Sequence, residues 1–186
     1  MVTIRHEKPS DIAAREALLD DAFGSGRAAK TAERLREGRQ TADGLSFTAA
    51  ERGRVVGTVR LWHIVLGQAQ PALLLGPLAV AADRRNRGIG AALMRHALRA
   101  AQQLGHGAVL LVGDAPYYGR FGFSADKTGA LRLPGPYQRE RLLGCELSPG
   151  ALDGSRGLIR AAVALAPTPA AANRRPMAAG ALPQAA

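Results

Sequence analysis

The stretch that decides the fold runs from Leu78 to Met94 and reads LAVAADRRNRGIGAALM. In it an apolar run gives way to a basic loop, and Gly88 and Gly90 stand where a helix-like apolar pattern begins. The first N–H groups of a helix have no partner inside the helix and lie at the positive end of its dipole. A glycine there lets the oxygens of an anion approach the backbone, because no Cβ stands in the way. The stretch therefore predicts an anion-binding loop at the start of a helix.

The other residues of the loop favour the same interpretation. Arg84, Arg85 and Arg87 bring full positive charges, and Asn86 adopts a left-handed backbone conformation more easily than most residues. The plainer alternative is a turn whose glycines only ease the chain into the helix. Neither standard nucleotide motif matches, since a P-loop needs Gly-x-x-x-x-Gly-Lys-Ser/Thr. A dinucleotide fingerprint has a small residue at its third position and a first glycine that follows the strand directly. Here Leu93 stands at the third position, and residues 81–87 separate the strand from Gly88.

The composition fits a globular protein with an anionic partner. The 186 residues, 47% hydrophobic and 22% charged, are enough for one domain. The formal net charge of +10 favours phosphates, acidic proteins or nucleic acid, or else reflects a generally arginine-rich composition. A single cysteine excludes an intramolecular disulfide framework, and with four scattered His it offers no metal-ligand spacing. No apolar run reaches the ~18–20 residues that cross a membrane, so we expect a cytoplasmic protein without a membrane partner.

The order of the predicted elements is that of an α/β protein. Residues 12–23 (IAAREALLDDAF) indicate a first helix, and residues 28–38 (AAKTAERLREG) a second one that is polar and exposed. Strands follow, with a hairpin turn at Arg52-Gly53. The apolar run at residues 71–80 suits a central strand covered on both faces. The helix and strand after it complete one right-handed crossover.

Two motifs in the right order resemble one family. The apolar strand followed by residues 85–90 (RNRGIG) resembles the acyl-CoA-binding motif of the GNAT N-acyltransferase superfamily, Arg/Gln-x-x-Gly-x-Gly/Ala. Residues 117–123 (YYGRFGF) resemble the aromatic-Tyr-x-x-x-Gly-Phe segment that follows the next strand in this superfamily. Together with GPLAV and RLPGP, these motifs are similar to those of a YhbS-like bacterial subgroup, over roughly residues 2–160. Asn86 and Ala82 depart mildly from the Gly and Pro that are frequent at their positions.

The resemblance implies an α/β (α+β) GNAT fold, a mixed central sheet of about six to seven strands flanked by helices. One strand splays from its neighbour, and the pantetheine arm of acyl-CoA pairs with its free backbone groups. N–H groups of the glycine loop hold the pyrophosphate, and an N–H near Leu78 or Ala79 stabilises the oxyanion. The residues implied to bind acetyl-CoA are Leu78, Ala79, Val80, Arg85, Asn86, Arg87, Gly88, Ile89, Gly90 and Ala91.

The activity implied is N-acetyl transfer from acetyl-CoA to a primary amine by direct attack, without a metal. An alkyl ammonium has a pKa of about 10 and must lose a proton before it attacks. Tyr118 matches the general acid of the family, which protonates the departing CoA thiolate, and Tyr117 is expected to be a packing residue or part of the pocket wall. Asp114, at the end of a buried strand, is the favoured candidate for the general base. His63, Glu51 and a chain of water molecules stay open for that role.

The main alternative is an acyl-CoA-binding sensor of the same fold without turnover. Nucleic-acid binding has little support, because the arginines spread along the whole chain and no recognition motif is present. The acceptor is a small molecule or a protein, and a homodimer would be in keeping with the family. Specificity in the family comes from N-terminal helices and late loops, here roughly residues 20–39 and 128–140. Arginines in these stretches favour an amine that carries a carboxylate: Arg27, Arg34, Arg36, Arg39, Arg132 and Arg139.

The chain is expected to divide into three parts. Residues 1–148 form the acyltransferase domain, and residues 149–166 an extension packed on it. Residues 167–186 are rich in Ala and Pro, with no aromatic residue to anchor them. This composition predicts a disordered tail.

Overall fold

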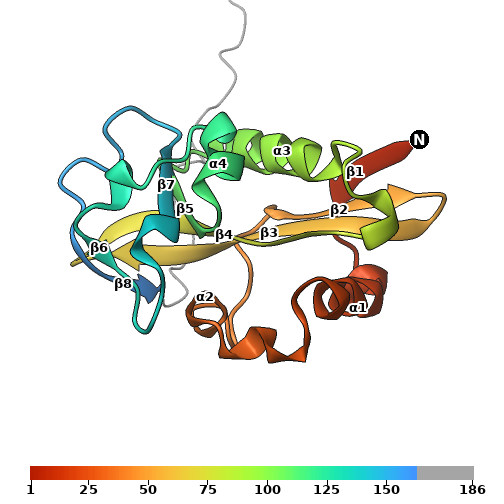
Figure 1. The fold of residues 1–186 in the computed structure, drawn as a ribbon. Helices are drawn as coiled ribbons and strands as arrows, with labels where there is room; N and C mark the ends of the chain where they lie inside the picture. The colour runs from red at the N-terminus through yellow and green to blue at the C-terminus, as the bar shows by residue number, and fades with distance from the viewer. Residues whose placement is uncertain (163–186) are drawn as a thin grey trace, which may run out of the picture.

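The computed structural model describes residues 1–162 of the chain (Figure 1). The strands are β1 (Val2–His6), β2 (Ser46–Glu51), β3 (Arg54–Leu66), β4 (Gln70–Val80), β5 (Ala108–Val112), β6 (Leu131–Arg132), β7 (Leu142–Glu146) and β8 (Gly157–Ala161). The helices are α1 (Ile12–Phe23), α2 (Thr31–Arg34), α3 (Ile89–Gln103) and α4 (Ala115–Tyr118), with short 3-10 turns between elements. The tail predicted at residues 167–186 lies outside the described residues.

The strands form one mixed sheet in the order β1-β2-β3-β4-β5-β7. β4 and β5 are parallel and are connected by α3, whereas the other pairs along this path are antiparallel. β8 pairs with the last part of β3 and with β6. The predicted α/β fold with a mixed central sheet is confirmed. The sheet has eight strands where about six to seven were expected, because the short strands β6 and β8 join it.

Helices cover both faces of the sheet. α3 lies across one face, and α1 and α2 lie on the opposite face (Figure 1). α3 buries Leu93, Met94 and Ala97 completely, and each of the two larger side chains contributes about 1.5–3 kcal/mol to stability. Gly57 on β3 allows this close approach, because a Cβ there would lie 2.9 Å from Cδ1 of Leu93 and 3.2 Å from Cγ2 of Ile89. This packing fixes the start of α3, where the glycine loop ends.

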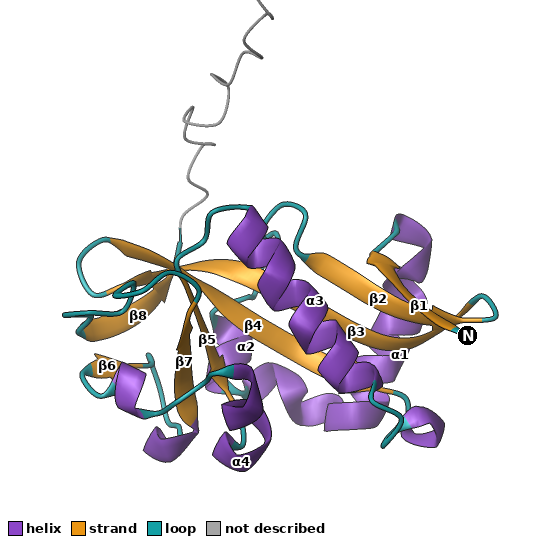
Figure 2. Ribbon diagram, turned by 90° about the horizontal axis from the view of Figure 1, so that it is seen from above, coloured by secondary structure: helices purple, strands orange, loops and turns teal. Residues whose placement is uncertain are grey.

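β4 separates from β5 partway along its length. Parallel pairing with β5 is limited to Leu73 and Leu74. Just beyond, at Gly76-Pro77, the register between β3 and β4 shifts, so that two residues of β4 oppose one of β3. The last part of β4 pairs with β3 alone, and Figure 2 shows β5 and β7 running away from it. The predicted splayed strand is therefore present.

The polar helix expected over residues 28–38 is wrong in length and in exposure. Only four residues, Thr31–Arg34, are α-helical, and Thr31, Leu35 and Arg36 are buried. Leu35 joins an apolar cluster on this face of the sheet, so the segment turns inwards. The sequence looks like that of a solvated helix because one of its buried side chains is an arginine. The charge of this Arg36 is paired with Glu33 three residues earlier, and its guanidinium also donates a hydrogen bond to the Leu75 carbonyl.

β8 lies inside the stretch that was expected to form an extension. It pairs antiparallel with β3, from Ile64 opposite Ala161 to Leu66 opposite Ile159. A domain boundary at residue 148 stays a prediction. Within the described part of the chain, no helix combines the length and the hydropathy that a membrane span requires.

Candidate active site

The glycine loop has a backbone conformation suited to an anion. Asn86 and Gly88 have positive φ angles of 60° and 77°, so the chain turns sharply into α3, and the left-handed conformation expected for Asn86 is confirmed. No side chain of the described residues caps α3, which leaves its first N–H groups available. Arg85 and Arg87 are exposed, as are the two residues with positive φ. The loop thus presents backbone donors and positive charge at the surface.

Ion pairs attach this loop to the β2–β3 hairpin. Nε of Arg84 lies 2.7 Å from Oε2 of Glu51, and its Nη1 lies 2.8 Å from Oδ2 of Asp83. Arg54 reaches the same Asp83 oxygen at 3.1 Å. The hydrogen bond from Arg84 lowers the pKa of the Glu51 carboxyl. Arg84 is therefore a structural residue, whereas Arg87 leaves its charge exposed.

Two side chains hold the bulge of β4 from the face that carries α2. Nε1 of Trp62 donates a hydrogen bond to the carbonyl oxygen of Gly76 (2.6 Å), and Nη2 of Arg36 donates one to that of Leu75 (3.4 Å). Past the bulge, residues 78–80 pair with β3 on one side, and β5 has already diverged on the other. The backbone groups on that second side can pair with an extended ligand, as in strand addition.

A cavity of about 460 Å³ opens where β4 and β5 separate. Its walls come from residues 75–78 of β4, residues 111–114 at the end of β5, and Tyr118 of α4. The segment around α2 and the loop at residues 133–138 complete it. α4 and α2 lie on opposite faces of the sheet (Figure 1). Both contribute to the cavity wall, so the cavity reaches from one face to the other through the split.

Tyr118 lines this cavity and is half-buried at the end of α4. Its ring lies directly against Gly113, where an added Cβ would be 2.7 Å from Cδ2 of the tyrosine. Burial raises the pKa of the Tyr118 phenol to about 12, with further contributions from Tyr117 and Asp114. The phenol therefore keeps its proton at pH 7. Tyr117 is not part of the wall, and its hydroxyl lies 3.0 Å from where a Cβ on Gly90 would stand.

One of the three side chains considered as a general base reaches the cavity. Asp114 lines it with 72% of its side chain exposed, and Oδ1 lies 3.1 Å from Nη2 of Arg141. Glu51 is bound to the glycine loop, and His63 is an exposed residue whose ring centroid lies 5.5 Å from that of His106. Neither Glu51 nor His63 lines the cavity. In residues 1–162, no group of three or more potential ligands could hold a metal.

A second carboxylate on the cavity wall was missed in the sequence. Glu33 of α2 lines the cavity with 20% of its side chain exposed, and its Oε1 lies 2.7 Å from Nη1 of Arg36. Arg36 is buried, which lowers the pKa of its guanidinium, and the charge of Glu33 opposes that shift. The i, i+3 spacing of an acid and a base was the signal that could have revealed this pair. That spacing is equally typical of a solvated helix face.

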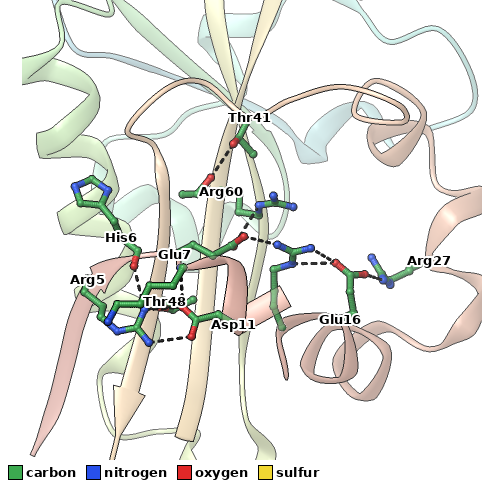
Figure 3. A network of polar contacts seen from close by, with 12 residues as sticks. Arg5, His6, Glu7, Asp11, Glu16, Arg27, Thr41, Thr48 and Arg60 are labelled. Carbon is green, nitrogen blue, oxygen red and sulfur yellow. Dashed lines mark hydrogen bonds and ion pairs between the residues drawn. The ribbon is translucent and has the colours of Figure 1, made fainter. Parts of the chain in front are cut away.

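A chain of ion pairs runs from Glu7 to Arg27 (Figure 3). Glu7 binds Arg15, whose Nη2 lies 2.5 Å from Oε1 of Glu16, and the other oxygen of Glu16 binds Arg27. Nε of Arg27 lies 2.8 Å from Oδ1 of Asp20, and Arg27 lines the cavity. The charge of Arg27 is therefore balanced by two carboxylates of the protein itself.

Both stretches predicted to decide specificity contribute to the cavity wall. Arg27 and Arg36 are the two predicted arginines that line it. The other four do not, namely Arg34, Arg39, Arg132 and Arg139. Lys30 and Arg141 line it as well, so the wall carries four cationic side chains and the two carboxylates.

A mixed sheet that splits beside a glycine loop at the start of its crossover helix defines the GNAT class of acetyltransferases. The family model described as "Acetyltransferase (GNAT) family" matches residues 13–123, more than half of the chain. The chain belongs to this family.

Individual relatives agree with this membership. The Escherichia coli (strain K12) protein called "Uncharacterized N-acetyltransferase YhbS" is 33% identical over 157 residues, which cover 84% of this chain and 93% of that protein. The crystal structure of E. coli YhbS in complex with CoA matches with a TM-score of 0.75 and 30% identity, over 87% of this chain and 89% of the other. A GNAT family acetyltransferase from Brucella melitensis, in complex with acetyl-CoA, matches with a TM-score of 0.64 and 28% identity, over 88% and 97%. The resemblance to YhbS-like proteins is confirmed.

Proposed function

We propose that this protein is an N-acetyltransferase that moves the acetyl group of acetyl-CoA to a primary amine by direct attack. The observation that carries the proposal is the cavity, which brings the phenol of Tyr118 to the free end of β4. The two matching crystal structures support acetyl-CoA as the donor, since one contains CoA and the other acetyl-CoA.

The split strand and the glycine loop bind the donor in this proposal. Backbone groups of Leu78, Ala79 and Val80 pair with the pantetheine arm, and N–H groups of residues 85–91 hold the pyrophosphate. The open surroundings of Gly88 support this role, because a Cβ there would meet no atom within 4 Å. Phosphate oxygens can therefore reach the backbone at the N-terminus of α3.

The chain's own groups then assist the transfer. Acetyl-CoA supplies the thioester carbonyl, and an N–H near Leu78 or Ala79 stabilises its oxygen as negative charge develops. Tyr118 gives its proton to the CoA sulfur as the C–S bond breaks. Because its pKa is raised to about 12, this acid does not lose its proton as pH rises from 7 to 10. Asp114 stays a candidate for the group that removes the proton of the amine.

The wall of the cavity favours an acceptor that carries a carboxylate as well as an amine. Lys30 adds positive charge to it and lies over the ring of Phe23, 5.1 Å from the centroid, and no carboxylate of the described residues forms an ion pair with it. Arg141 also lines the cavity, but it is paired with Asp114. A carboxylate on the acceptor would pair with Lys30. An amino acid or a similar small amine has this combination of charges.

Two measurements test the proposal on the purified full chain. Calorimetric titration with acetyl-CoA gives the donor affinity, and thiol release is then followed with pairs of amines, each carboxylated amine beside its decarboxylated analogue. We expect Tyr118→Phe to bind acetyl-CoA as the wild type does and to lose about 10²–10³-fold in kcat. Tyr117→Phe is the matched comparison, and we expect it to change donor affinity more than kcat, because its hydroxyl lies beside Gly90.

The same measurements separate the alternatives. Acetyl-CoA binding without thiol release on any amine would favour an acyl-CoA sensor without turnover. Absence of binding would contradict the anion-binding role of the glycine loop. Equal rates with carboxylated and decarboxylated amines would contradict the proposed acceptor class alone.

A further inference from the structure

The cavity has two carboxylates among the described residues that line it, and their environments differ. Asp114 is 72% exposed and is paired with Arg141 at the surface. Glu33 is 20% exposed and lies on the opposite side of the split, on the wall that α2 provides. An ammonium group that leaves water for a partly closed cavity needs a carboxylate partner there. Glu33 is the more enclosed of the two candidates.

Contacts to β4 place Glu33 near the point where the strands separate. Its Oε1 accepts a hydrogen bond from Nη1 of Arg36 (2.7 Å), and Nη2 of the same guanidinium donates to the carbonyl oxygen of Leu75 (3.4 Å). That Nη2 atom lies 2.8 Å from where a Cβ on Gly76 would stand. One planar guanidinium therefore connects the carboxylate to the bulge that precedes Leu78.

Among the described residues, no hydrogen bond is made to the second oxygen of Glu33, so this oxygen can accept one from a ligand. The hydrogen bond from Arg36 is made to Oε1, and an ionised carboxylate can accept at both oxygens. The side chain is 20% exposed and lines the cavity, and Arg60 of β3 is a second cation whose charge interacts with it. The Leu75 carbonyl fixes the other end of the Arg36 guanidinium, which limits the freedom of Glu33 to turn away.

We propose that Glu33 binds the ammonium group of the acceptor and takes its proton, with Arg36 as the positioning residue. This assignment rests on the proposed acetyl transfer. One N–H bond of the ammonium breaks, and its proton passes to a Glu33 oxygen and then to solvent. The neutral nitrogen forms a bond to the acetyl carbon, the C–S bond breaks, and the sulfur receives the proton of Tyr118. The nitrogen loses its second proton to solvent, from which Tyr118 is reprotonated.

The assignment also explains how two substrates reach one point. The glycine loop and α3 lie on one face of the sheet, and α2 lies on the other (Figure 1). The donor extends along β4 from the face of α3, and the acceptor meets Glu33 from the face of α2. The split between β4 and β5 is where the two can touch.

The experiment compares Glu33→Gln with the wild type, in binding and in turnover. Amine binding is measured by calorimetry on protein saturated with CoA, and kcat/KM is measured from pH 6 to pH 10. We expect Glu33→Gln to bind amine about 10-fold more weakly and to lose about 10²–10³-fold in kcat/KM at pH 7. We expect this loss to shrink as pH approaches the amine pKa of about 10, because neutral amine then needs no base. Glu33→Asp should recover part of the activity.

Glu37→Gln is the matched control, since Glu37 is an exposed carboxylate on the same segment. It should behave as the wild type, and CoA affinity should be unchanged in all variants. A loss in Glu33→Gln that is equal at every pH would indicate a structural role and overturn the assignment. So would wild-type behaviour of Glu33→Gln beside a pH-dependent loss in Asp114→Asn, or a wild type that binds no amine. Amine binding that depends on Glu33 without thiol release would support the assignment and contradict the transfer reaction.

Discussion

In the proposed site, the glycine loop binds the donor and the segment around α2 meets the acceptor, and the two are specified in different ways. The loop owes its shape to neighbouring residues, with positive φ at Asn86 and Gly88 directly before α3. The α2 segment owes its position to Arg36, whose guanidinium contacts Leu75, 39 residues further along the chain. Local chemistry therefore determines the shape of the loop, and tertiary contacts determine the position of the α2 segment.

The variant with the largest expected effect, Arg36→Met, tests whether the α2 segment depends on its buried ion pair. Arg36→Met leaves Glu33 without its partner and removes the donor to the Leu75 carbonyl. We expect the free energy of unfolding, measured by urea denaturation, to fall by about 3 kcal/mol. Arg34→Met, at an exposed position on the same turn, should change it by less than about 0.5 kcal/mol. Equal losses of unfolding free energy in the two variants would show that the contacts of Arg36 do not hold the α2 segment in place.

A second variant tests whether tertiary packing also matters on the donor side. Gly57→Val would place side-chain atoms where Leu93 and Ile89 now pack, and should push back the start of α3. We expect a loss of about 2 kcal/mol in stability and about 10-fold in acetyl-CoA affinity, measured by denaturation and calorimetry. Thr58→Val is the control, because its buried hydroxyl has no hydrogen-bond partner among the described residues. Unchanged CoA affinity in Gly57→Val would mean that the loop is specified by its own residues alone.

The ion pair between Arg5 and Asp11 lies outside both regions, and its contribution to stability can be compared with that of the Glu33–Arg36 pair. Asp11 accepts hydrogen bonds from Arg5 at 2.6 and 2.9 Å and from the Lys8 N–H at 2.9 Å, and these hold its pKa well below the ordinary value. A depressed folded-state pKa stabilises the protein above the unfolded pKa of about 3.9, and the contribution is lost as pH falls further.

We therefore expect Asp11→Asn to lower the free energy of unfolding by about 1.5 kcal/mol at pH 7. The difference from the wild type should shrink as pH falls below about 4, in urea denaturation over a pH series. A difference that stays constant down to pH 2 would argue against the ion pair as its cause.

We expect the smallest effect on removing the exposed charge of Arg87 in the glycine loop. Arg87→Ala should raise the Kd for acetyl-CoA about three-fold at low salt, and the effect should fade as salt screens the charge. Stability should change by less than about 0.5 kcal/mol. Arg99→Ala, an exposed arginine near the far end of α3, should leave the affinity unchanged in the same calorimetric titrations. An equal loss in both variants would indicate a general charge effect.

The geometry of the proposed donor side could be predicted because its determinants are adjacent in sequence. Gly88, Asn86 and the apolar spacing of α3 fix the loop, and Gly76-Pro77 marks the break in regular pairing on β4. Tyr118 could be found by its motif, and the structure brings it to the cavity.

The geometry of the proposed acceptor side could not be predicted in the same way. Residues 28–38 carry the polar pattern of a solvated helix, and the pattern does not say that Arg36 is buried against β4. Glu33 gains its place from that contact, and no local signal separates it from exposed neighbours such as Glu37. The carbonyl partners at the bulge, Trp62 and Arg36, come from distant parts of the chain.

The hydrogen bonds at the bulge also affect the cost of ligand binding. Free strand edges tend to pair with a neighbour, and a site that opened only when its ligand arrived would use part of the binding energy to separate strands. Here Trp62 and Arg36 already hold the carbonyls of Gly76 and Leu75, so the two halves of the sheet stand apart in the free protein. In the proposed complex with acetyl-CoA, the groove is preorganised and no strand-opening step subtracts from the affinity for the donor.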